Sequence, residues 1–468
     1  MKSDTIAAIA TGMTDSGIGI VRISGEDAVM IVDKIYRSKL GKSCFRDFKS
    51  HTIHYGYIVN KGKIIDEVMV SLMISPNSYT AEDTVEINCH GGVLMVKKIL
   101  ETVIENGARL AEPGEFTKRA FLNGRIDLSK AEAVMDIIHS KNKFALENSI
   151  RQLRGSVSEI IRELREDVIY EIAFIESALD DPEHISLDGY HDRLQEKTES
   201  ILGRLKKLMD SAENGKIMKE GIHTVIIGKP NAGKSSFLNL LVGEEKAIVT
   251  DIAGTTRDVL EESISLNGIQ LNIIDTAGIR FTEDTVEKIG VEKARKFAKE
   301  ADLIVYVVDV SVPLDESDYD IIHMISDKKF IILLNKTDLP VLATENMVRD
   351  EIKKRCEKNV LPEVRFIKTS MKENEGIDVF EETIKELFFH GEILLNDEVV
   401  ITNMRHKEAV MDAYESMLQV KESLENNMPE DFYSIDLMSC YESLGRIIGE
   451  EIGEDLMNEI FSQFCMGK

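Results

Sequence analysis

The sequence predicts a multidomain α+β and α/β protein, in which a helical domain in two pieces flanks an inserted α/β domain. Residues 1–120 alternate strand-like runs with turn signals. Apolar residues then recur at three- and four-residue spacing on both sides of the chain's centre. Between these helical stretches, a strand, a glycine-rich loop and a helix follow one another from His223 to Leu241.

Changes in this pattern set the predicted domain boundaries. The predicted domains are an N-terminal α+β domain at 1–120, a first helical part at 121–216, an inserted α/β domain at 217–380 and a second helical part at 381–468. Each helical part carries an apolar stripe that must be buried, so we expect the two parts to form one domain. An α/β domain whose termini lie close together tolerates insertion at such a point.

Composition and charge limit the possible classes of function. The chain has 468 residues, 43% of them hydrophobic, which is typical of a globular protein. The formal net charge of -26 argues against a general nucleic-acid coat, so an RNA partner would need a local basic patch. No apolar run approaches the roughly 20 residues that span a bilayer, and no signal peptide is evident. The five cysteines lack paired spacing and fit a reducing cytosol, so we expect a soluble cytoplasmic protein: Cys44, Cys89, Cys356, Cys440 and Cys465.

The N-terminal domain is predicted to contain four strands and one helix. The strands cover residues 17–23, 50–59, 63–74 and 84–89, with a turn at 60–62, and the helix covers 93–105. His90, beside Gly91 and Gly92, is a candidate ligand or base. A turn histidine with a structural role is the favoured alternative.

Helical periodicity covers residues 128–179 and 190–209, and returns at 406–424 and 435–464. A row of arginines lies near one face of the first of these helices, and it could contact RNA phosphates. We favour the alternative that neighbouring glutamates neutralise it by i,i+3 and i,i+4 pairing. The arginines are Arg151, Arg154, Arg162 and Arg165, and the glutamates are Glu159, Glu163 and Glu166.

A phosphate-binding loop is predicted from Gly228 to Ser235, which spells G-x-x-x-x-G-K-S between an apolar strand and a helix. Its glycines let backbone N–H groups close around a phosphate, while Lys234 supplies a point charge and Ser235 can hold Mg²⁺. The predicted nucleotide-binding residues of this loop are Asn231, Ala232, Gly233, Lys234, Ser235 and Ser236.

Three further motifs identify the nucleotide. Asp275-Thr276-Ala277-Gly278 follows a strand, so its carboxylate should lie near the metal. The polar loop Gly254 to Asp258, GTTRD, can close over Mg²⁺ and the γ-phosphate through Thr256. Asn335-Lys336-Thr337-Asp338 ends another strand, and an aspartate there pairs with the amino and imino groups of guanine. The central domain is therefore predicted to be a Ras-like P-loop GTPase domain that binds GTP rather than ATP.

Over its whole length the chain resembles the tRNA modification GTPase family MnmE, also called TrmE. The resemblance rests on four segments in the same order: PGEFTKRAFLNGR at 113–125, DLSKAEA at 127–133, the GTTRD loop and the terminal CMGK at 465–468. It implies an N-terminal tetrahydrofolate-binding domain that also forms a homodimer, and GTPase domains that dimerise transiently.

The resemblance also implies the reaction. Members work in a hetero-oligomer with the FAD-dependent partner MnmG (GidA), which carries FAD and NADH. Together they add a carboxymethylaminomethyl or aminomethyl group at C5 of the wobble uridine of certain tRNAs. The one-carbon donor is 5,10-methylenetetrahydrofolate or 5-formyltetrahydrofolate. By motif position, Arg22, Glu86, Arg125 and Lys468 belong at the folate site, although Arg22 and Glu86 could instead form a structural ion pair.

By the same resemblance, GTP hydrolysis should depend on potassium. Ile279 occupies the position where Ras-type GTPases orient water with glutamine, and the family uses K⁺ instead. Oxygen atoms of Asn231, Thr250, Ile252 and Thr255 would hold K⁺, and Ser235 and Thr256 would hold Mg²⁺. The remaining nucleotide-site residues implied are Asp251, Ala253, Gly254, Asp275, Thr276, Ala277, Gly278, Asn335, Lys336, Asp338 and Ser370.

One position departs from the family pattern. Phe281 stands where relatives usually carry a water-orienting glutamate, and Glu283 is the candidate substitute. We therefore expect hydrolysis that K⁺ stimulates but that is weaker than in relatives with the glutamate. The predicted catalytic residues are Lys234, Thr256, Asp275, Gly278 and Glu283.

A switch GTPase that assists ribosome assembly is the competing class, because it shares the P-loop and GTTRD motifs. Its members usually add a second GTP-binding domain or a small RNA-binding domain, whereas this chain has one P-loop and ends in helices. A membrane iron-transport GTPase would need spanning helices. Cys465 is a candidate nucleophile near the folate site, but its sequence neighbours do not establish a low thiol pKa.

Overall fold

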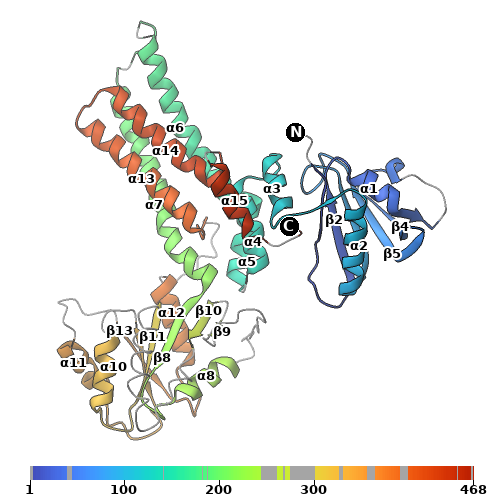
Figure 1. The fold of residues 1–468 in the computed structure, drawn as a ribbon. Coiled ribbons are helices and arrows are strands. Elements are labelled where there is room, and N and C mark those ends of the chain that lie inside the picture. The colour runs from blue at the N-terminus through green and yellow to red at the C-terminus, as the bar shows by residue number, and fades with distance from the viewer. Residues whose placement is uncertain are drawn as a thin grey trace. The chain divides into compact units, whose positions relative to one another are not determined.

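The computed structural model describes most of the chain, and Figure 1 shows its elements. The described residues are 4–39, 45–140, 142–181, 183–186, 188–243, 261–266, 269–274, 301–325, 330–355, 364–389, 399–450, 452–464 and 467. The chain splits into two compact units, the first formed by 1–138, 149–199 and 412–468 and the second by 139–148 and 200–411.

The first unit begins with a seven-stranded sheet in the order β3-β4-β5-β6-β2-β1-β7. Its neighbouring strands are antiparallel except for β1 and β7. The strands are β1 (Ile6–Ile9), β2 (Ser16–Ser24), β3 (Tyr36–Ser38), β4 (Thr52–Asn60), β5 (Lys63–Met73), β6 (Thr84–Gly91) and β7 (Arg109–Leu110). Helices α1 (Ala28–Ile35) and α2 (Val93–Glu105) and the 3-10 helix η1 (Phe45–Asp47) accompany the sheet.

Residue alternation decides which face of this sheet is buried. Val68, Val70 and Leu72 alternate along β5 with less buried residues and join one core with side chains of α1 and α2. Strand β1 is buried on both faces, because Ala7 lies in that core while Ile6 packs with Phe116 in a second cluster. Helices α1 and α2 thus cover one face of the sheet, and on the other face Phe116 covers β1.

Helices of eight to 25 residues make up most of the remainder of the first unit. They are α3 (Glu115–Leu122), α4 (Leu128–His139), α6 (Ser156–Asp180), α14 (Glu430–Ile448) and α15 (Glu454–Ser462). Helix α14 packs along α6, as Figure 1 shows, and α15 packs against α3. Helices α5 (Lys143–Arg154), α7 (Tyr190–Glu220) and α13 (Met404–Glu425) contribute residues to both units.

The second unit contains a six-stranded sheet in the order β13-β12-β11-β8-β10-β9, parallel except for the β9 and β10 pair. The strands are β8 (Ile222–Ile227), β9 (Glu261–Leu266), β10 (Ile269–Ile274), β11 (Leu303–Asp309), β12 (Phe330–Asn335) and β13 (Val364–Thr369). The helices are α8 (Lys234–Gly243), α10 (Glu316–Ile325), α11 (Glu345–Arg355) and α12 (Ile377–Phe389). Apolar clusters cover both faces of the sheet, so its central strands β11 and β12 are nearly continuous hydrophobic runs.

This architecture confirms the predicted fold class, with a mainly parallel α/β sheet inserted between two groups of helices. The four predicted N-terminal strands and the helix at 93–105 are present, whereas β1, α1, β3, β7 and α3 were not predicted. The exact domain boundaries stay predictions.

Two helical predictions need correction. Residues 128–179 form three helices, α4, α5 and α6, because Gly155 adopts a left-handed conformation with φ of 110° between α5 and α6. Residues 435–464 likewise form two helices, with Gly449 at φ of 92° after α14. Glycine interrupted a periodic pattern that the apolar spacing alone suggested was continuous.

The prediction of an arginine row on one helix was therefore wrong. Arg151 and Arg154 belong to α5, while Arg162 and Arg165 belong to α6. Arg162 donates to Asp127 Oδ2 at 2.7 Å. Arg165 is buried, pairs with Glu450 and lies 3.9 Å from the centre of the Tyr441 ring. These partners come from α14 and from residues that flank α4 and α14, and not from the i,i+3 and i,i+4 glutamates. They make Arg165 a packing residue.

His90 is also placed differently from the prediction. Strand β6 continues through His90 to Gly91, so His90 is a strand residue and not a turn residue. Its Nδ1 lies 2.7 Å from Oδ1 of the buried Asp66, whose Oδ2 accepts from the His90 backbone N–H at 2.9 Å. The ring is held by a neighbouring strand, which favours the structural role.

Candidate functional site

The P-loop runs from the end of β8 to the start of α8, beside the central strands of the second sheet. Gly228, Asn231 and Gly233 have φ of 151°, 62° and 110°, all in the left-handed range. A Cβ at Gly228 would collide with the Val307 carbonyl, and one at Gly233 would collide with the Asn335 amide. Glycine is therefore required at both positions by the close approach of these neighbouring atoms as well as by the turn geometry.

Lys234 is held inside this loop. Its Nζ donates to the carbonyl oxygens of Gly228 at 2.6 Å and Lys229 at 2.7 Å. Burial lowers the pKa of Lys234 from its ordinary value. Ser235 and Ser236 are exposed in the first turn of α8, where free N–H groups and the helix dipole favour an anion.

Asn335 connects the P-loop to the loop that follows β13. Its Nδ2 donates to the Ala232 carbonyl at 2.8 Å, and its Oδ1 accepts from the Met371 N–H at 3.2 Å. The side chain is buried, so this bridge fixes three loops at the carboxyl edge of the parallel sheet. One Nδ2 hydrogen remains for a ligand.

Asp338 and Ser370 complete the described part of the predicted base site. Ser370 Oγ donates to Asp338 Oδ1 at 2.9 Å, while Asp338 itself is exposed. Lys336 has φ of 69° and donates from Nζ to Asp309 Oδ2 at 2.5 Å. Burial alone would raise the pKa of Asp309, but hydrogen bonds from Lys336 and Ser311 outweigh it and lower the pKa.

Many of the predicted site residues lie outside the described residues. They are Thr250, Asp251, Ile252, Ala253, Gly254, Thr255, Thr256, Asp275, Thr276, Ala277, Gly278, Glu283 and Lys468, and also Phe281 and Cys465. Of the predicted nucleotide-site residues, the structure brings together those of the P-loop and of the segments after β12 and β13.

A second cluster lies on the N-terminal sheet. Arg22 and Glu86 face each other across β2 and β6, with Arg22 Nε donating to Glu86 Oε1 at 2.8 Å. The ion pair considered as an alternative to folate binding is thus present. The Arg22 guanidinium also donates to the Gly467 carbonyl at 3.2 Å. Tyr79 lies between two cations, with its ring centroid 5.5 Å from the Arg22 Cζ and 4.9 Å from the Arg125 Cζ.

Sequence analysis did not single out Tyr79 or Phe116. Phe116 is fully buried, and its ring centroid lies 5.7 Å from the Arg22 Cζ. Tyr79 Oη and Thr117 Oγ1 are 2.9 Å apart. An aromatic residue in the NSYTAED stretch before β6 was the available signal, but nothing local in sequence indicated its arginine neighbours.

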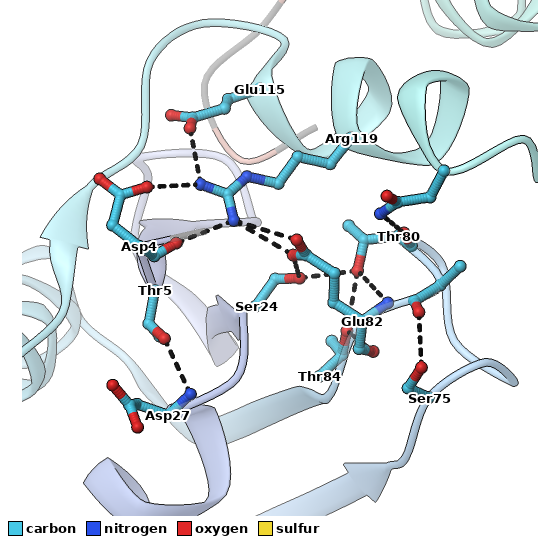
Figure 2. Close-up of polar contacts among 12 residues, drawn as sticks. Asp4, Thr5, Ser24, Asp27, Ser75, Thr80, Glu82, Thr84, Glu115 and Arg119 are labelled. Atoms are coloured by element: carbon cyan, nitrogen blue, oxygen red, sulfur yellow. Dashed lines mark hydrogen bonds and ion pairs between the residues drawn. The ribbon is translucent and has the colours of Figure 1, made fainter. Parts of the chain in front are cut away.

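Arg119, on α3, lies at the centre of a polar network with Asp4, Glu82 and Glu115, as Figure 2 shows. It pairs with Asp4 at 3.0 Å, Glu115 at 2.9 Å and Glu82 at 3.2 Å, although only 8% of the residue is exposed. Burial lowers the pKa of Arg119, but the hydrogen bond to Glu115 and the charge of Glu82 outweigh it and raise the pKa. Glu82 also accepts from Ser24 Oγ at 2.8 Å. The arginine therefore joins α3 to the strand ends of the sheet.

The described cysteines and metal candidates add no further chemistry. Burial raises the pKa of Cys89 to about 11 and that of Cys440 to about 12, so both thiols stay protonated. Among the residues that the structure describes, no group of three or more His, Cys, Asp or Glu side chains could hold a metal ion. Within the same part of the chain, no helix has the length and apolar character needed to cross a membrane.

The geometry of the second unit defines the class of the protein: a P-loop nucleotide-binding protein with the guanine-type loop of GTPases. Comparison with known proteins agrees. The model described as "GTP-binding protein TrmE N-terminus" matches residues 5–125, and the "MnmE helical domain" model matches residues 128–465. The chain belongs to the MnmE (TrmE) family of tRNA modification GTPases.

Full-length relatives support this membership. The chain is 56% identical over 468 residues to "tRNA modification GTPase MnmE" of Lachnoclostridium phytofermentans (100% of each chain), and 50% identical over 465 residues to that of Clostridioides difficile (99% of each). The solved G domain of the T. maritima FeoB iron transporter is 23% identical and covers 36% of this chain and 98% of its own, with a TM-score of 0.24. That last likeness is too weak to support any statement about this chain.

Proposed function

We propose that this protein binds and hydrolyses GTP as the GTPase component of a tRNA wobble-uridine modification system. The observation that carries the proposal is the Asn335 bridge between the P-loop and Met371, which follows Ser370, the hydrogen-bond partner of Asp338. The match of the chain to this family over its whole length supports the proposal. Since tRNA is a cytoplasmic substrate, the proposal also places the protein in the cytoplasm.

Asp338 gives the sharpest test of guanine specificity. Its carboxylate would accept from the amino and imino groups of guanine, whereas an asparagine would present an N–H that suits the C2 carbonyl of xanthine. We expect Asp338→Asn to weaken GTP binding by about a hundredfold or more and to gain XTP binding. Fluorescent nucleotide titrations would measure both affinities. Unchanged GTP affinity would remove Asp338 from the base site.

Metal ions would act on the phosphates of this nucleotide. Ser235 offers an exposed hydroxyl at the start of α8, which suits Mg²⁺, with Thr256 as the second proposed ligand. Asn231 offers an exposed amide oxygen in the P-loop, which suits K⁺, with oxygen atoms of Thr250, Ile252 and Thr255. The cations would offset negative charge that develops as the γ-phosphoryl group leaves. Lys234 and the backbone of Gly278 would position that group, and the Asp275 carboxylate would lie near the Mg²⁺ ion.

We expect GTP hydrolysis to be faster in K⁺ than in Na⁺, and Asn231→Ala to remove most of this difference while leaving nucleotide affinity nearly unchanged. Phe281→Glu should raise the K⁺-stimulated rate, because a carboxylate can orient water and phenylalanine cannot. A rate in Phe281→Glu equal to the wild-type rate would shift the water-orienting role to Glu283 or elsewhere.

The N-terminal cluster is the proposed site for a tetrahydrofolate one-carbon donor, either the 5,10-methylene or the 5-formyl form. Arg125 is exposed beside Tyr79, so a guanidinium and an aromatic ring are available to an anionic, aromatic ligand, with Arg22, Glu86 and Lys468 as further contacts. Calorimetry with 5-formyltetrahydrofolate tests this site. Arg125→Ala should weaken binding, whereas Lys39→Ala, on an exposed pair with Glu67, should not.

The proposed assembly follows the family. A homodimer would form through the N-terminal domains, with transient dimerisation of the GTPase domains. MnmG would supply FAD and NADH, and the product would carry a carboxymethylaminomethyl or aminomethyl group at uridine C5.

Mass spectrometry of nucleosides from bulk tRNA, with and without the gene, tests the whole proposal. Loss of 5-aminomethyl-type uridines, restored by the intact gene, is expected. An unchanged nucleoside profile would overturn the modification role and favour a ribosome-assembly switch.

A further inference from the structure

Lys229, the second residue of the P-loop, is bound to the start of helix α10. Its Nζ donates to Asp318 Oδ2 at 2.6 Å and to Asp315 Oδ2 at 3.0 Å. Only 14% of the Lys229 side chain and 1% of the Asp318 side chain are exposed, whereas Asp315 is 58% exposed. The pair with Asp318 is thus shielded from water and salt, unlike an ordinary surface pair.

The carboxylate that receives Lys229 is itself fixed from two further directions. Asp318 Oδ1 accepts from the hydroxyl of Tyr306, on β11, at 2.7 Å. Asp318 Oδ2 also accepts from the Asp315 backbone N–H at 3.0 Å. Tyr306 is fully buried, and burial together with the charge of Asp318 raises the pKa of its hydroxyl well above the ordinary value, so it remains a donor. Rotation of the Asp318 side chain would break all these bonds.

The main chain of Lys229 lies where the phosphates would bind. Its carbonyl accepts from Lys234 Nζ at 2.7 Å and from the Ala232 N–H at 3.3 Å. The Ala232 carbonyl in turn accepts from Asn335. The side chain of Lys229 is therefore anchored in α10, while its carbonyl orients the lysine that carries the phosphate-binding charge.

We propose that Lys229 is a positioning residue for nucleotide binding: its buried ion pair with Asp318 fixes the P-loop in the shape that presents Lys234 to the phosphates. Its ammonium acts through the loop and does not touch the nucleotide. The inference rests on the proposed GTP site and adds to it a residue outside the predicted set.

A double substitution separates this role from a merely structural one. Lys229→Met keeps the chain length but leaves Asp318 buried without its cation, which should destabilise the second unit. In Lys229→Met/Asp318→Asn the stranded charge is gone and the asparagine oxygen still accepts from Tyr306, while the bond from the Asp315 N–H is lost. We expect the double variant to regain part of the lost thermal stability yet to bind a fluorescent GDP analogue about tenfold or more weakly than wild type.

Three further variants serve as controls and as a substitute for the double variant. Lys229→Arg keeps the pair and should bind the analogue within about threefold of wild type. Lys354→Met removes an exposed lysine paired with Glu351 on α11, and should change neither stability nor affinity. If the double variant does not fold, Lys229→Gln takes its place, because glutamine retains a donor toward Asp318 but carries no charge. Its affinity for the fluorescent GDP analogue is then compared with that of wild type in the same way.

Wild-type affinity in a stable, folded double variant would overturn the positioning role while leaving the proposed GTP site intact. Failure of the wild-type protein to bind either GTP or GDP would instead overturn the proposed function, and the inference with it.

Discussion

Arg119 shows how a single buried charge can hold the N-terminal domain together. The cation is almost fully covered, yet Asp4, Glu82 and Glu115 all lie within ion-pair distance. Removing one member of such a group leaves a buried charge without its counter-charge. The resulting loss of stability is larger than the net stabilisation that the intact group provides. Since Arg119 lies next to the Tyr79 cluster in the fold, its loss should disturb both stability and ligand binding.

We expect Arg119→Met to destabilise the N-terminal sheet by about 3 to 5 kcal/mol. Hydrogen exchange of peptides from β2 and β6, followed by mass spectrometry, would measure this locally. The neighbouring Lys118→Met is the matched control, because Lys118 is only half-buried and the one contact described for it is a hydrogen bond to the Asn458 side chain. Equal exchange rates in both variants would contradict the assigned role of Arg119.

The same residues set a dependence of stability on pH. Burial raises the pKa of Glu115, but hydrogen bonds from Arg109 and the Glu112 backbone outweigh it, so the pKa is lowered overall, and the Arg109 hydrogen bond lowers that of Asp4. A lowered folded-state pKa adds stability that is present above the unfolded-state pKa, about 4, and is lost as pH falls through the folded value.

Stability of the N-terminal sheet should therefore fall as pH decreases below about 4. Hydrogen exchange is itself pH-dependent, so limited proteolysis with pepsin at pH 4 and below, compared between variants, is the suitable measurement. Arg119→Met should show a weaker acid dependence than wild type, since part of the carboxylate pairing is already gone. If wild type and Arg119→Met showed the same dependence of proteolysis on pH, other carboxylates would be responsible for it.

At the scale of elements, Gly114 allows α15 to approach the start of α3. Gly114 and Gly124 flank α3 with nearly equal φ of 69° and 71°. A Cβ at Gly114 would lie 2.8 Å from the Phe464 Cβ and would also meet the Phe461 carbonyl, whereas a Cβ at Gly124 has nothing within 4 Å. The two positions share backbone strain and differ in the space available.

Gly124→Ala should cost only the left-handed backbone penalty, about 1 to 2 kcal/mol. Gly114→Ala should cost clearly more, because α15 must move away from α3. Urea unfolding followed by circular dichroism would measure the free energy of unfolding of both variants. The difference between the two values gives the cost of moving α15 away from α3. Equal losses of stability would mean that α15 can move away from α3 without loss of packing energy.

The elements that sequence could predict are those with long patterns. Strand β5 has 11 residues and alternates clearly, and the P-loop lies between a strand and a helix in a fixed order. In contrast, β1, β3 and β7 have four, three and two residues, too few to establish a period. These short strands depend on their partners in the sheet, which sequence alone does not reveal.

The candidate site likewise contains residues that local motifs predicted and contacts between residues far apart in the sequence. Lys234, Asn335 and Asp338 belong to local motifs and were predicted. The link between Lys229 and Asp315 joins residues 86 apart, and that between Tyr79 and Thr117 joins residues 38 apart. Neither has a local pattern. His90 was misplaced because pairing with β2 carries β6 as far as Gly91, one of the two glycines that suggested a turn.

On the scale of the whole molecule, the described residues of the proposed nucleotide site all belong to one of the two compact units. GDP should therefore slow hydrogen exchange in peptides covering β8 and β12 and leave those covering β2 and β6 unchanged. At a nucleotide concentration of about 100 times the dissociation constant, the stabilisation is about 2.7 kcal/mol. Asp338→Asn should abolish the effect. Equal protection in both units would reveal energetic coupling between them.

The bond between Arg22 and the Gly467 carbonyl joins residues 445 positions apart. A ribosome releases the chain from its N-terminus, so the first sheet can fold long before residue 467 is synthesised. During that interval Arg22 has Glu86 as a partner but lacks the carbonyl. The N-terminal cluster is consequently among the last parts of the protein to be completed during biosynthesis, and a translation product shortened by a few residues would keep the sheet and lose this contact.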